Sequence, residues 1–179
     1  NKVVGIIGGG NIGRQVASRV QAFGSTVQYY DPFRLPEEME EKLHMKYVGL
    51  EELIRTSDVI TLHVPLMDST RHMIGEKEIE KMKDGAILIN VARGGLMDDE
   101  AVVNAVNSGK LSGAGIDCVE EEPAKPGSPI LANPNIIVTP HVGGGSADIS
   151  DVMFPMITEN IERLAEGKEL KYVVNQKYL

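Results

Sequence analysis

The feature that most constrains this chain is a glycine-rich turn between an apolar run and a helical pattern. Residues 3–7 form a continuous apolar run rich in β-branched side chains, which is typical of a strand buried on both faces. The sequence GGGNIG follows at residues 8–13, and Ile12, Val16, Val20 and Phe23 then recur at helical spacing before Gly24. A strand, a G-x-G-x-x-G turn and a helix in this order predict the first unit of an α/β fold.

Each glycine of the turn has its own physical role. Gly8 permits the tight turn, Gly10 lets a pyrophosphate approach the backbone, and Gly13 lets the helix pack closely on the strand. The helix N-terminus then presents free N–H groups and partial positive charge to the anion. The turn therefore predicts dinucleotide binding, with a purely structural glycine-rich turn as the alternative.

Asp31 ends the second expected strand, 18 residues after Gly13. A carboxylate at this place accepts hydrogen bonds from a ribose 2′-OH and repels a 2′-phosphate, so it favours NAD over NADP. Arg34 leaves NADP open, because a nearby arginine can pair with a 2′-phosphate. A turn-forming Asp-Pro pair is the simpler alternative for Asp31.

The remaining chain alternates short β-branched runs with helical patterns. Further strands are expected at residues 26–30, 46–48, 59–62, 86–91, 111–116 and 136–139, and helices at 50–54, 76–83, 98–107 and 146–167. This alternation predicts a Rossmann-type doubly wound parallel sheet with helices on both faces. We expect one domain over residues 1–167, with residues 168–179 beyond it.

Three segments carry more specific expectations. In the last helix Met153, Ile157, Ile161 and Leu164 are expected to form a buried stripe, and Pro155 to kink or break the helix because it lacks a backbone donor. Residues 34–46 are polar with weak periodicity and predict only a short strand at their end. Residues 118–135 form the longest irregular stretch, and a loop of that length is usually functional.

Charge and cysteine content exclude several classes of function. The 18 Lys and Arg against 26 Asp and Glu give a net charge of −8, which argues against a nucleic-acid partner. Cys118 is the only cysteine, so we expect no disulfide, no metal centre, and a reducing compartment such as the cytoplasm. The sequence has no long apolar run and no charged-then-apolar leader, so we expect no membrane association.

Titratable residues gather just past the expected strand ends, where ligands of open α/β sheets bind. They are His63, Arg93, Asp117, the acidic run 120–122 and His141. Without further context the simpler interpretations are favoured, with Arg93 in a surface ion pair, His141 as a loop histidine and the acidic run as a solvated face.

Five sequence stretches carry a resemblance to a known family. They are VGIIGGGNIG at 4–13, LHVPL at 62–66, INVARGG at 89–95, GAGIDCVEEEP at 113–123 and VTPHVGG at 138–144. In this order and spacing the chain resembles the cofactor-binding domain of the D-isomer-specific 2-hydroxyacid dehydrogenases. The residues after His141 are loosely similar to the phosphoglycerate dehydrogenase branch.

The resemblance assigns roles to individual residues. It implies that Arg93 holds the substrate carboxylate, that His141 is the acid/base and that Glu122 is its partner. His63 is the rival acid/base, but it has no evident carboxylate partner. The cofactor-binding positions implied by the motif and the resemblance are Gly8, Gly10, Asn11, Ile12, Gly13, Asp31, His63, Val64, Pro65, Thr70, Val91, Ala92, Arg93, Asp117 and His141.

These observations predict an NAD-dependent oxidoreductase that transfers hydride between nicotinamide and a D-2-hydroxy acid or 2-oxo acid. In the family this domain is inserted into a substrate-binding domain, so the chain resembles one domain excised from a two-domain protein, and residues 168–179 the start of the returning segment. The resemblance also implies a homodimer for the full-length protein and an inactive fragment. The alternative function is an NAD(H)-sensing regulatory or corepressor-type module on the same scaffold.

Overall fold

The computed structural model of the chain describes residues 2–175. The strands are β1 (Val3–Ile7), β2 (Thr26–Tyr30), β3 (Met45–Tyr47), β4 (Val59–Leu62), β5 (Ala86–Asn90), β6 (Leu111–Ile116) and β7 (Ile136–Val138). The helices are α1 (Asn11–Ala22), α2 (Glu37–Leu43), α3 (Leu50–Thr56), α4 (Glu76–Lys81), α5 (Asp99–Asn107), α6 (Pro129–Ala132) and α7 (Ile149–Ala165).

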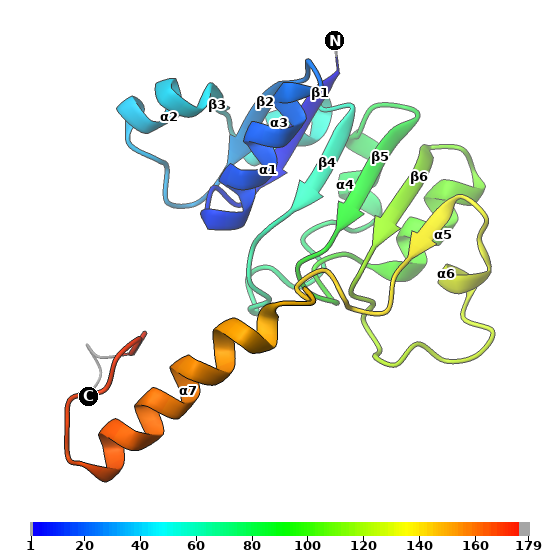
Figure 1. Cartoon of the computed structure of the whole chain (residues 1–179). Coiled ribbons are helices and arrows are strands. Elements are labelled where there is room, and N and C mark those ends of the chain that lie inside the picture. The colour runs from blue at the N-terminus through cyan, green and yellow to red at the C-terminus, as the bar shows by residue number, and fades with distance from the viewer. Residues whose placement is uncertain (1, 176–179) are drawn as a thin grey trace. The chain divides into compact units, whose positions relative to one another are not determined.

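The described strands form one parallel sheet in the order β3-β2-β1-β4-β5-β6-β7 (Figure 1). The chain winds outward from β1 in one direction and, after crossing to β4, in the other. The carboxyl ends of β1 and β4 therefore part at the switch point, where doubly wound sheets bind their ligands. The predicted fold class is confirmed.

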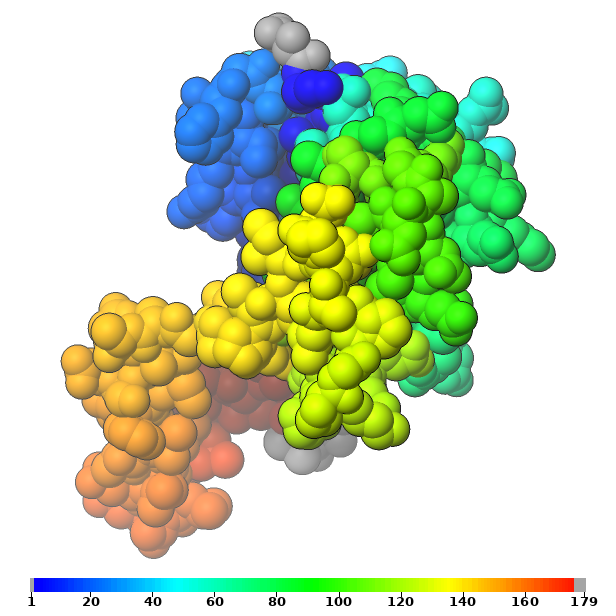
Figure 2. Space-filling model, turned by 90° about the vertical axis from the view of Figure 1, so that its right-hand side faces the viewer, coloured from blue at the N-terminus to red at the C-terminus, as the bar shows by residue number. Residues whose placement is uncertain are grey.

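Helices α1 and α3 cover opposite faces of the sheet at β1. A Cβ atom placed on Gly5 would lie 2.7 Å from the Leu53 side chain of α3. The next residue, Ile6, lies instead beneath Gly13 of α1. Successive strand residues point to opposite faces, so the two helices enclose β1 between two apolar clusters. Figure 2 shows the end of the sheet at β7, where residues around β7, coloured yellow, lie beside those of α5, coloured green.

The apolar stripe predicted on the first helix is only partly buried. Ile12 and Phe23, at the two ends of α1, are 67% and 89% exposed. The buried residues of α1 are Gly13 and Ala17, because small side chains let the helix lie close to the strand. Of the four apolar residues at helical spacing, Ile12 and Phe23 therefore contribute nothing to the buried face of α1.

Two helices were not expected from the sequence. α2 lies in the polar stretch after β2 and buries only Glu40, so it has no apolar stripe to reveal it. α6 is a single turn that begins at Pro129, inside the stretch expected to be irregular. The helix expected at 98–107 is present as α5, and Asp98 caps it, since its carboxylate accepts a hydrogen bond from the Ala101 N–H at 3.0 Å.

The chain divides into two compact units, Asn1–Gly143 and Gly144–Leu179. In the second unit, α7 begins after Asp148 rather than at Ser146 and runs continuously through Pro155. Of the predicted kink or break at Pro155, the break is wrong, because a proline removes only one hydrogen bond from a helix of 17 residues.

Within the second unit, the predicted apolar stripe of α7 is not covered by other described residues. Met153, Ile157, Ile161 and Leu164 are 47–69% exposed, and none of the described residues of α7 is buried. The segment after α7 folds back onto it, where the Asn160 side chain pairs with the Lys171 backbone at 2.7 and 2.9 Å. The last four residues of the predicted returning segment, 176–179, lie outside the described residues.

Within residues 2–175, the helices are all too short or too polar to cross a membrane.

Candidate functional site

The glycine-rich turn between β1 and α1 has no room for side chains at two of its glycines. Gly8 has a φ of +110°, and a Cβ atom there would lie 2.5 Å from the His63 carbonyl oxygen. A Cβ atom on Gly13 would lie 2.0 Å from the Gly8 carbonyl oxygen. The turn therefore rests on the end of β4 on one side and on the first turn of α1 on the other.

Gly10, in contrast, faces open space. It is the N-cap of α1, and a Cβ atom placed on it meets no heavy atom within 4 Å. Among the described residues, no side chain caps α1, so the N–H groups of its first turn remain available to an anion. This open, uncapped helix start fits the pyrophosphate of a dinucleotide, with Asn11 and Ile12 beside it.

Asp31 ties the end of β2 to the same turn. One oxygen of its half-buried carboxylate accepts a hydrogen bond from the Gly9 N–H at 2.8 Å, and the other accepts one from the Phe33 N–H at 2.8 Å. A carboxylate has about four acceptor positions, so both oxygens can still accept from ribose hydroxyls. Arg34, the residue that left NADP open, is paired with Glu40.

His63 lies at the end of β4, beside Gly8. Its backbone N–H donates to the Ile7 carbonyl at 2.7 Å, and the ring nitrogen Nε2 lies 3.0 Å from the Thr61 hydroxyl. Burial lowers the pKa of His63, so the neutral imidazole is favoured. A neutral histidine with a hydroxyl partner is suited to contact a ligand rather than to store a proton.

The loop after β4 is held by its own hydrogen bonds. The Thr70 hydroxyl donates to the Pro65 carbonyl at 2.7 Å and accepts from the Met67 N–H at 2.8 Å. Val64 packs against the turn, since its Cγ1 lies 3.1 Å from a Cβ atom placed on Gly8. The structure thus brings Val64 to the glycine turn, and Thr70 fixes Pro65 beyond it.

Glu122 and His141 come together from two loops that are 19 residues apart. The Glu122 carboxylate lies 2.8 Å from Nδ1 of His141, and the two side chains are 40% and 45% exposed. This contact leaves Nε2 as the ring nitrogen that can exchange a proton. His141 has a φ of +54°, in the left-handed region that most residues avoid.

Asp117 holds the loop that carries His141. Its buried carboxylate accepts hydrogen bonds from the Thr139 hydroxyl, the Val142 N–H at 3.0 Å and the Gly143 N–H at 2.7 Å. The hydrogen bond from Thr139, with those from the two backbone groups, holds the pKa of Asp117 below its usual range. Asp117 was predicted to touch the cofactor; its described contacts are with the loop that carries His141.

Asn90 is a site residue that the sequence reasoning missed. It is fully buried at the end of β5, where its side chain accepts from the Ala92 N–H at 3.1 Å and donates to the Arg93 carbonyl at 2.9 Å. These bonds shape the turn that presents the exposed Arg93, whose guanidinium donates to the Ala92 carbonyl at 2.6 Å. The sequence did contain a signal for Asn90, because it is a polar residue at the end of an otherwise apolar strand.

The loop of Arg93 lies directly against the loop of Glu122. A Cβ atom on Gly94 would lie 1.9 Å from the Val119 carbonyl oxygen, so only glycine fits there. Cys118 donates from Sγ to the Ala92 carbonyl at 3.5 Å across the same contact. All three predicted catalytic residues therefore lie on adjacent loops at one edge of the sheet.

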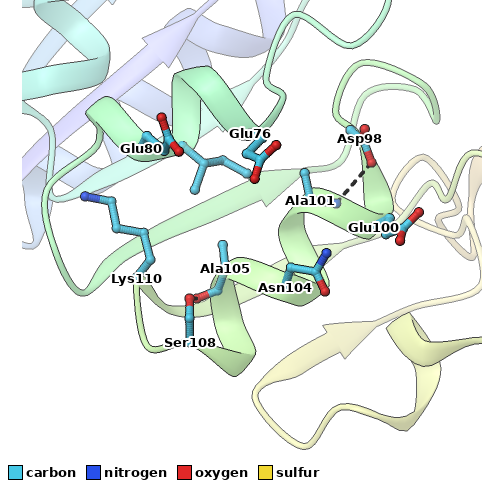
Figure 3. A pocket seen from close by; sticks show the side chains of 10 residues that line it. Glu76, Glu80, Asp98, Glu100, Ala101, Asn104, Ala105, Ser108 and Lys110 are labelled. Carbon is cyan, nitrogen blue, oxygen red and sulfur yellow. Dashed lines mark hydrogen bonds between the residues drawn. The ribbon is translucent and has the colours of Figure 1, made fainter.

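The Glu122–His141 pair opens into a cavity of about 560 Å³, which Asp117, Val119, Leu131 and Thr139 also line. A second hollow, of about 520 Å³, lies between α4 and α5 (Figure 3). Side chains such as Glu76, Glu80 and Asn104 line it, and it contains none of the predicted site residues.

Cys118, Glu122 and His141 place three possible metal ligands within 4.8 Å of one another. Burial raises the pKa of the Cys118 thiol, which favours the protonated form over the thiolate that a metal needs. We therefore assign no metal to this cluster.

The switch-point turn, the uncapped helix start and the strand-end carboxylate define a dinucleotide-binding α/β domain. Residues 1–143 match the family described as "D-isomer specific 2-hydroxyacid dehydrogenase, NAD binding domain". The chain therefore belongs to the D-isomer specific 2-hydroxyacid dehydrogenase family, as its sequence motifs predicted, and its cofactor is NAD.

Several known proteins are similar over nearly the whole chain. The chain is 40% identical to a glyoxylate reductase of Korarchaeum cryptofilum, over 98% of this chain and 53% of that protein. It is 41% identical to a D-3-phosphoglycerate dehydrogenase of Methanocaldococcus jannaschii, over 97% of this chain and 33% of that protein. The crystal structure of a glyoxylate reductase from Paecilomyes thermophila matches with a TM-score of 0.86 and 41% identity, over 98% of this chain and 53% of that one. The chain thus spans about half the length of the glyoxylate reductases, or less for the phosphoglycerate dehydrogenase.

Proposed function

We propose that the chain is the NAD-binding part of an oxidoreductase that transfers hydride between nicotinamide and a D-2-hydroxy acid or its 2-oxo acid. The observation that carries this proposal is the 2.8 Å contact between Glu122 and His141 on loops adjacent to that of Arg93. A proton donor with an orienting carboxylate and a guanidinium beside it are the groups that reduction of a 2-oxo acid requires.

Each of the three residues has a separate role in the proposed reaction. Arg93 clamps the substrate carboxylate through two parallel charge-assisted hydrogen bonds, for which a planar guanidinium is suited. His141 donates a proton from Nε2 to the 2-oxo oxygen during reduction and removes it from the hydroxyl during oxidation. Glu122, which lies 2.8 Å from Nδ1, fixes the orientation of the ring so that Nε2 faces the substrate. NAD, when bound, supplies the hydride donor or acceptor.

The cofactor contacts are part of the same proposal. Asn11, Ile12 and the glycines of the turn hold the pyrophosphate, and Asp31 accepts from the adenosine ribose. The proposed contacts of the nicotinamide half are His63, Val64, Pro65, Thr70, Val91, Ala92, Arg93, Asp117 and His141.

The organisation of the whole protein is a further proposal. We infer an NAD-binding domain over residues 1–167, with residues 168–179 leading back to a substrate domain, and a cytoplasmic homodimer as the functional form. The family match ends at residue 143, and α7 exposes an apolar stripe that another surface can cover. The relatives named above are reductases or dehydrogenases, so nothing favours the regulatory alternative.

Binding and turnover test the proposal separately. The 179-residue chain should bind NADH, seen as a change in nicotinamide fluorescence. A two-domain protein that carries this chain should oxidise at least one D-2-hydroxy acid with NAD, and the matching L-isomer serves as the control. NADH binding without turnover on any D-isomer, together with NAD-dependent oligomerisation, would favour the regulatory module instead.

A further inference from the structure

Arg34, three residues after Asp31, is held on two sides. Its Nε and Nη2 donate to the two oxygens of Glu40 at 2.8 and 2.7 Å, which makes a two-pronged ion pair. The carbon of its guanidinium lies 5.1 Å from the centre of the Tyr47 ring. Hydrogen bonds engage one edge of the guanidinium and a cation–π contact engages its face.

Glu40 is firmly anchored in turn. Its side chain is only 10% exposed, and Oε1 also accepts a hydrogen bond from the Tyr29 hydroxyl at 2.6 Å. The Tyr29 hydroxyl accepts from the Leu35 N–H at 2.9 Å. The hydrogen bonds from Arg34 lower the pKa of Glu40 to about 2, so the carboxylate is charged throughout the neutral range.

This network contacts the dinucleotide turn through the ring of Tyr29. The fully buried Tyr29 ring lies 3.0 Å from the position of a Cβ atom on Gly9. The N–H of Gly9 is the group that donates to Asp31. Glu40 and Arg34 are therefore built onto the same support as the proposed ribose acceptor.

We propose that Glu40 is a positioning residue for cofactor choice, because it holds Arg34 in a geometry that keeps the guanidinium from pairing with a 2′-phosphate. Turning Arg34 toward a 2′-phosphate would break two charge-assisted hydrogen bonds and leave a buried carboxylate without its cation. Arg34 is more than half exposed, so a new ion pair with a phosphate there would be screened by water and would not offset that loss. Two features therefore disfavour the binding of NADP: the negative charge of Asp31, and the ion pair with Glu40 that keeps Arg34 away from the 2′-phosphate.

Two variants of the chain test this inference, which rests on the proposed dinucleotide site. Glu40→Gln keeps an acceptor for Tyr29 but frees Arg34, so NADPH should bind on the order of tenfold more tightly in calorimetric titration. NADH should bind within about twofold of the unmutated chain, because it has no 2′-phosphate. The double variant Arg34→Ala with Glu40→Gln should lose the whole gain.

The outcomes are separable. If the gain for NADPH persists in the double variant, removal of a negative charge explains it and the inference is wrong. It is also wrong if Glu40→Gln leaves NADPH affinity unchanged. If the unmutated chain binds neither NADH nor NADPH, the proposed function fails instead.

A measurement on the unmutated chain covers the case in which Glu40→Gln does not fold. The Nε–H resonance of Arg34, assigned by its loss in Arg34→Lys, should have the same position with saturating NADPH as with saturating NADH. A shift seen only with NADPH would mean that Arg34 reaches the 2′-phosphate, which overturns the inference.

Discussion

Two ends of the candidate site differ sharply in how much of their environment this chain supplies. One end, here called the turn end, consists of the glycine-rich turn and the residues that support it. There Gly8, Gly9 and Glu40 are buried, and each is fixed by a close approach or a hydrogen bond. The other end, here called the reaction end, consists of the three proposed catalytic residues. There the side chains of Glu122 and His141 are 40% and 45% exposed, and Arg93 is exposed too. The chain thus provides a nearly complete support for the dinucleotide but leaves the reacting groups open to water.

The difference separates binding from catalysis. A dinucleotide needs an anion site and a ribose acceptor, both of which the turn end contains. Hydride transfer needs two carbons held close together in a dry site, and such orientation contributes about 7–11 kcal/mol to lowering a barrier. The chain alone should therefore bind NADH and show no reduction of 2-oxo acids above background.

The largest expected effect is at the reaction end. In a two-domain protein that carries this chain, His141→Asn should lower the rate of 2-oxo acid reduction by about 10²–10⁴-fold, the usual contribution of an acid/base group. Asparagine tolerates the left-handed backbone found at this position and cannot donate the proton. NADH affinity, measured by fluorescence titration, should change much less than the rate, because His141 is one of many proposed cofactor contacts and the turn end is unaltered. Loss of NADH binding would show that the two ends are not separable.

A matched pair of alanine variants tests the turn end. Gly13→Ala should lower the free energy of unfolding by about 3 kcal/mol, because the new methyl group collides with the Gly8 carbonyl. Gly10→Ala should change that free energy by about 0.5 kcal/mol or less, since the methyl group enters open space. It should nevertheless weaken NADH binding by about tenfold, because the pyrophosphate occupies that space. Urea unfolding and titration measure the two quantities, and equal destabilisation by both variants would contradict the geometry.

Cofactor preference gives a smaller effect. The unmutated chain should bind NAD more tightly than NADP by about 1–3 kcal/mol, the range for hydrogen bonds to a charged group. Asp31→Ser should reduce this margin, because it weakens the ribose contact and removes the repulsion of a 2′-phosphate. Calorimetry showing equal affinity of the unmutated chain for both cofactors would refute the role of Asp31.

The smallest expected effect is a change in acid stability. The pKa of Glu40 falls from 4.5 to about 2 in the folded chain, so its ion pair stabilises the fold above pH 4.5. That contribution should disappear as the pH falls toward 2. Glu40→Gln should remove on the order of 1 kcal/mol of this pH dependence, as followed by urea unfolding at several pH values. Parallel profiles for the two chains would rule out the ion pair as a source of stability.

The turn end could be predicted from the sequence because backbone sterics determine it. Glycine at positions 8 and 13 is required by approaches of 2.5 and 2.0 Å, so the pattern itself encodes the geometry. The doubly wound parallel sheet could be predicted because short apolar runs alternate with helical patterns along the chain, although the order of the strands came only from the structure. The family resemblance, which chain-wide similarity confirms, then pointed to Arg93, Glu122 and His141.

What failed was the prediction of which surface covers each apolar stripe. Periodicity marks Ile157 and Leu164 as one face of α7, but it does not show that the other described residues of the second unit leave that face uncovered. The helical spacing of Ile12 and Phe23 likewise did not show that both lie outside the buried face of α1. Asn90 was missed because its role depends on two backbone groups that only the folded turn brings within reach.

The strand order also has a consequence for how the domain assembles. Val4 of β1 pairs with Val27 of β2, but on its other side it pairs with Val59 of β4. The Gly8 turn rests on the His63 carbonyl, so its support is complete only when β4 has docked. Contacts between such distant segments form slowly, and a ribosome supplies the earlier segment first. The glycine turn is therefore synthesised early, yet it reaches its final shape only after more than fifty further residues have emerged and folded back onto β1.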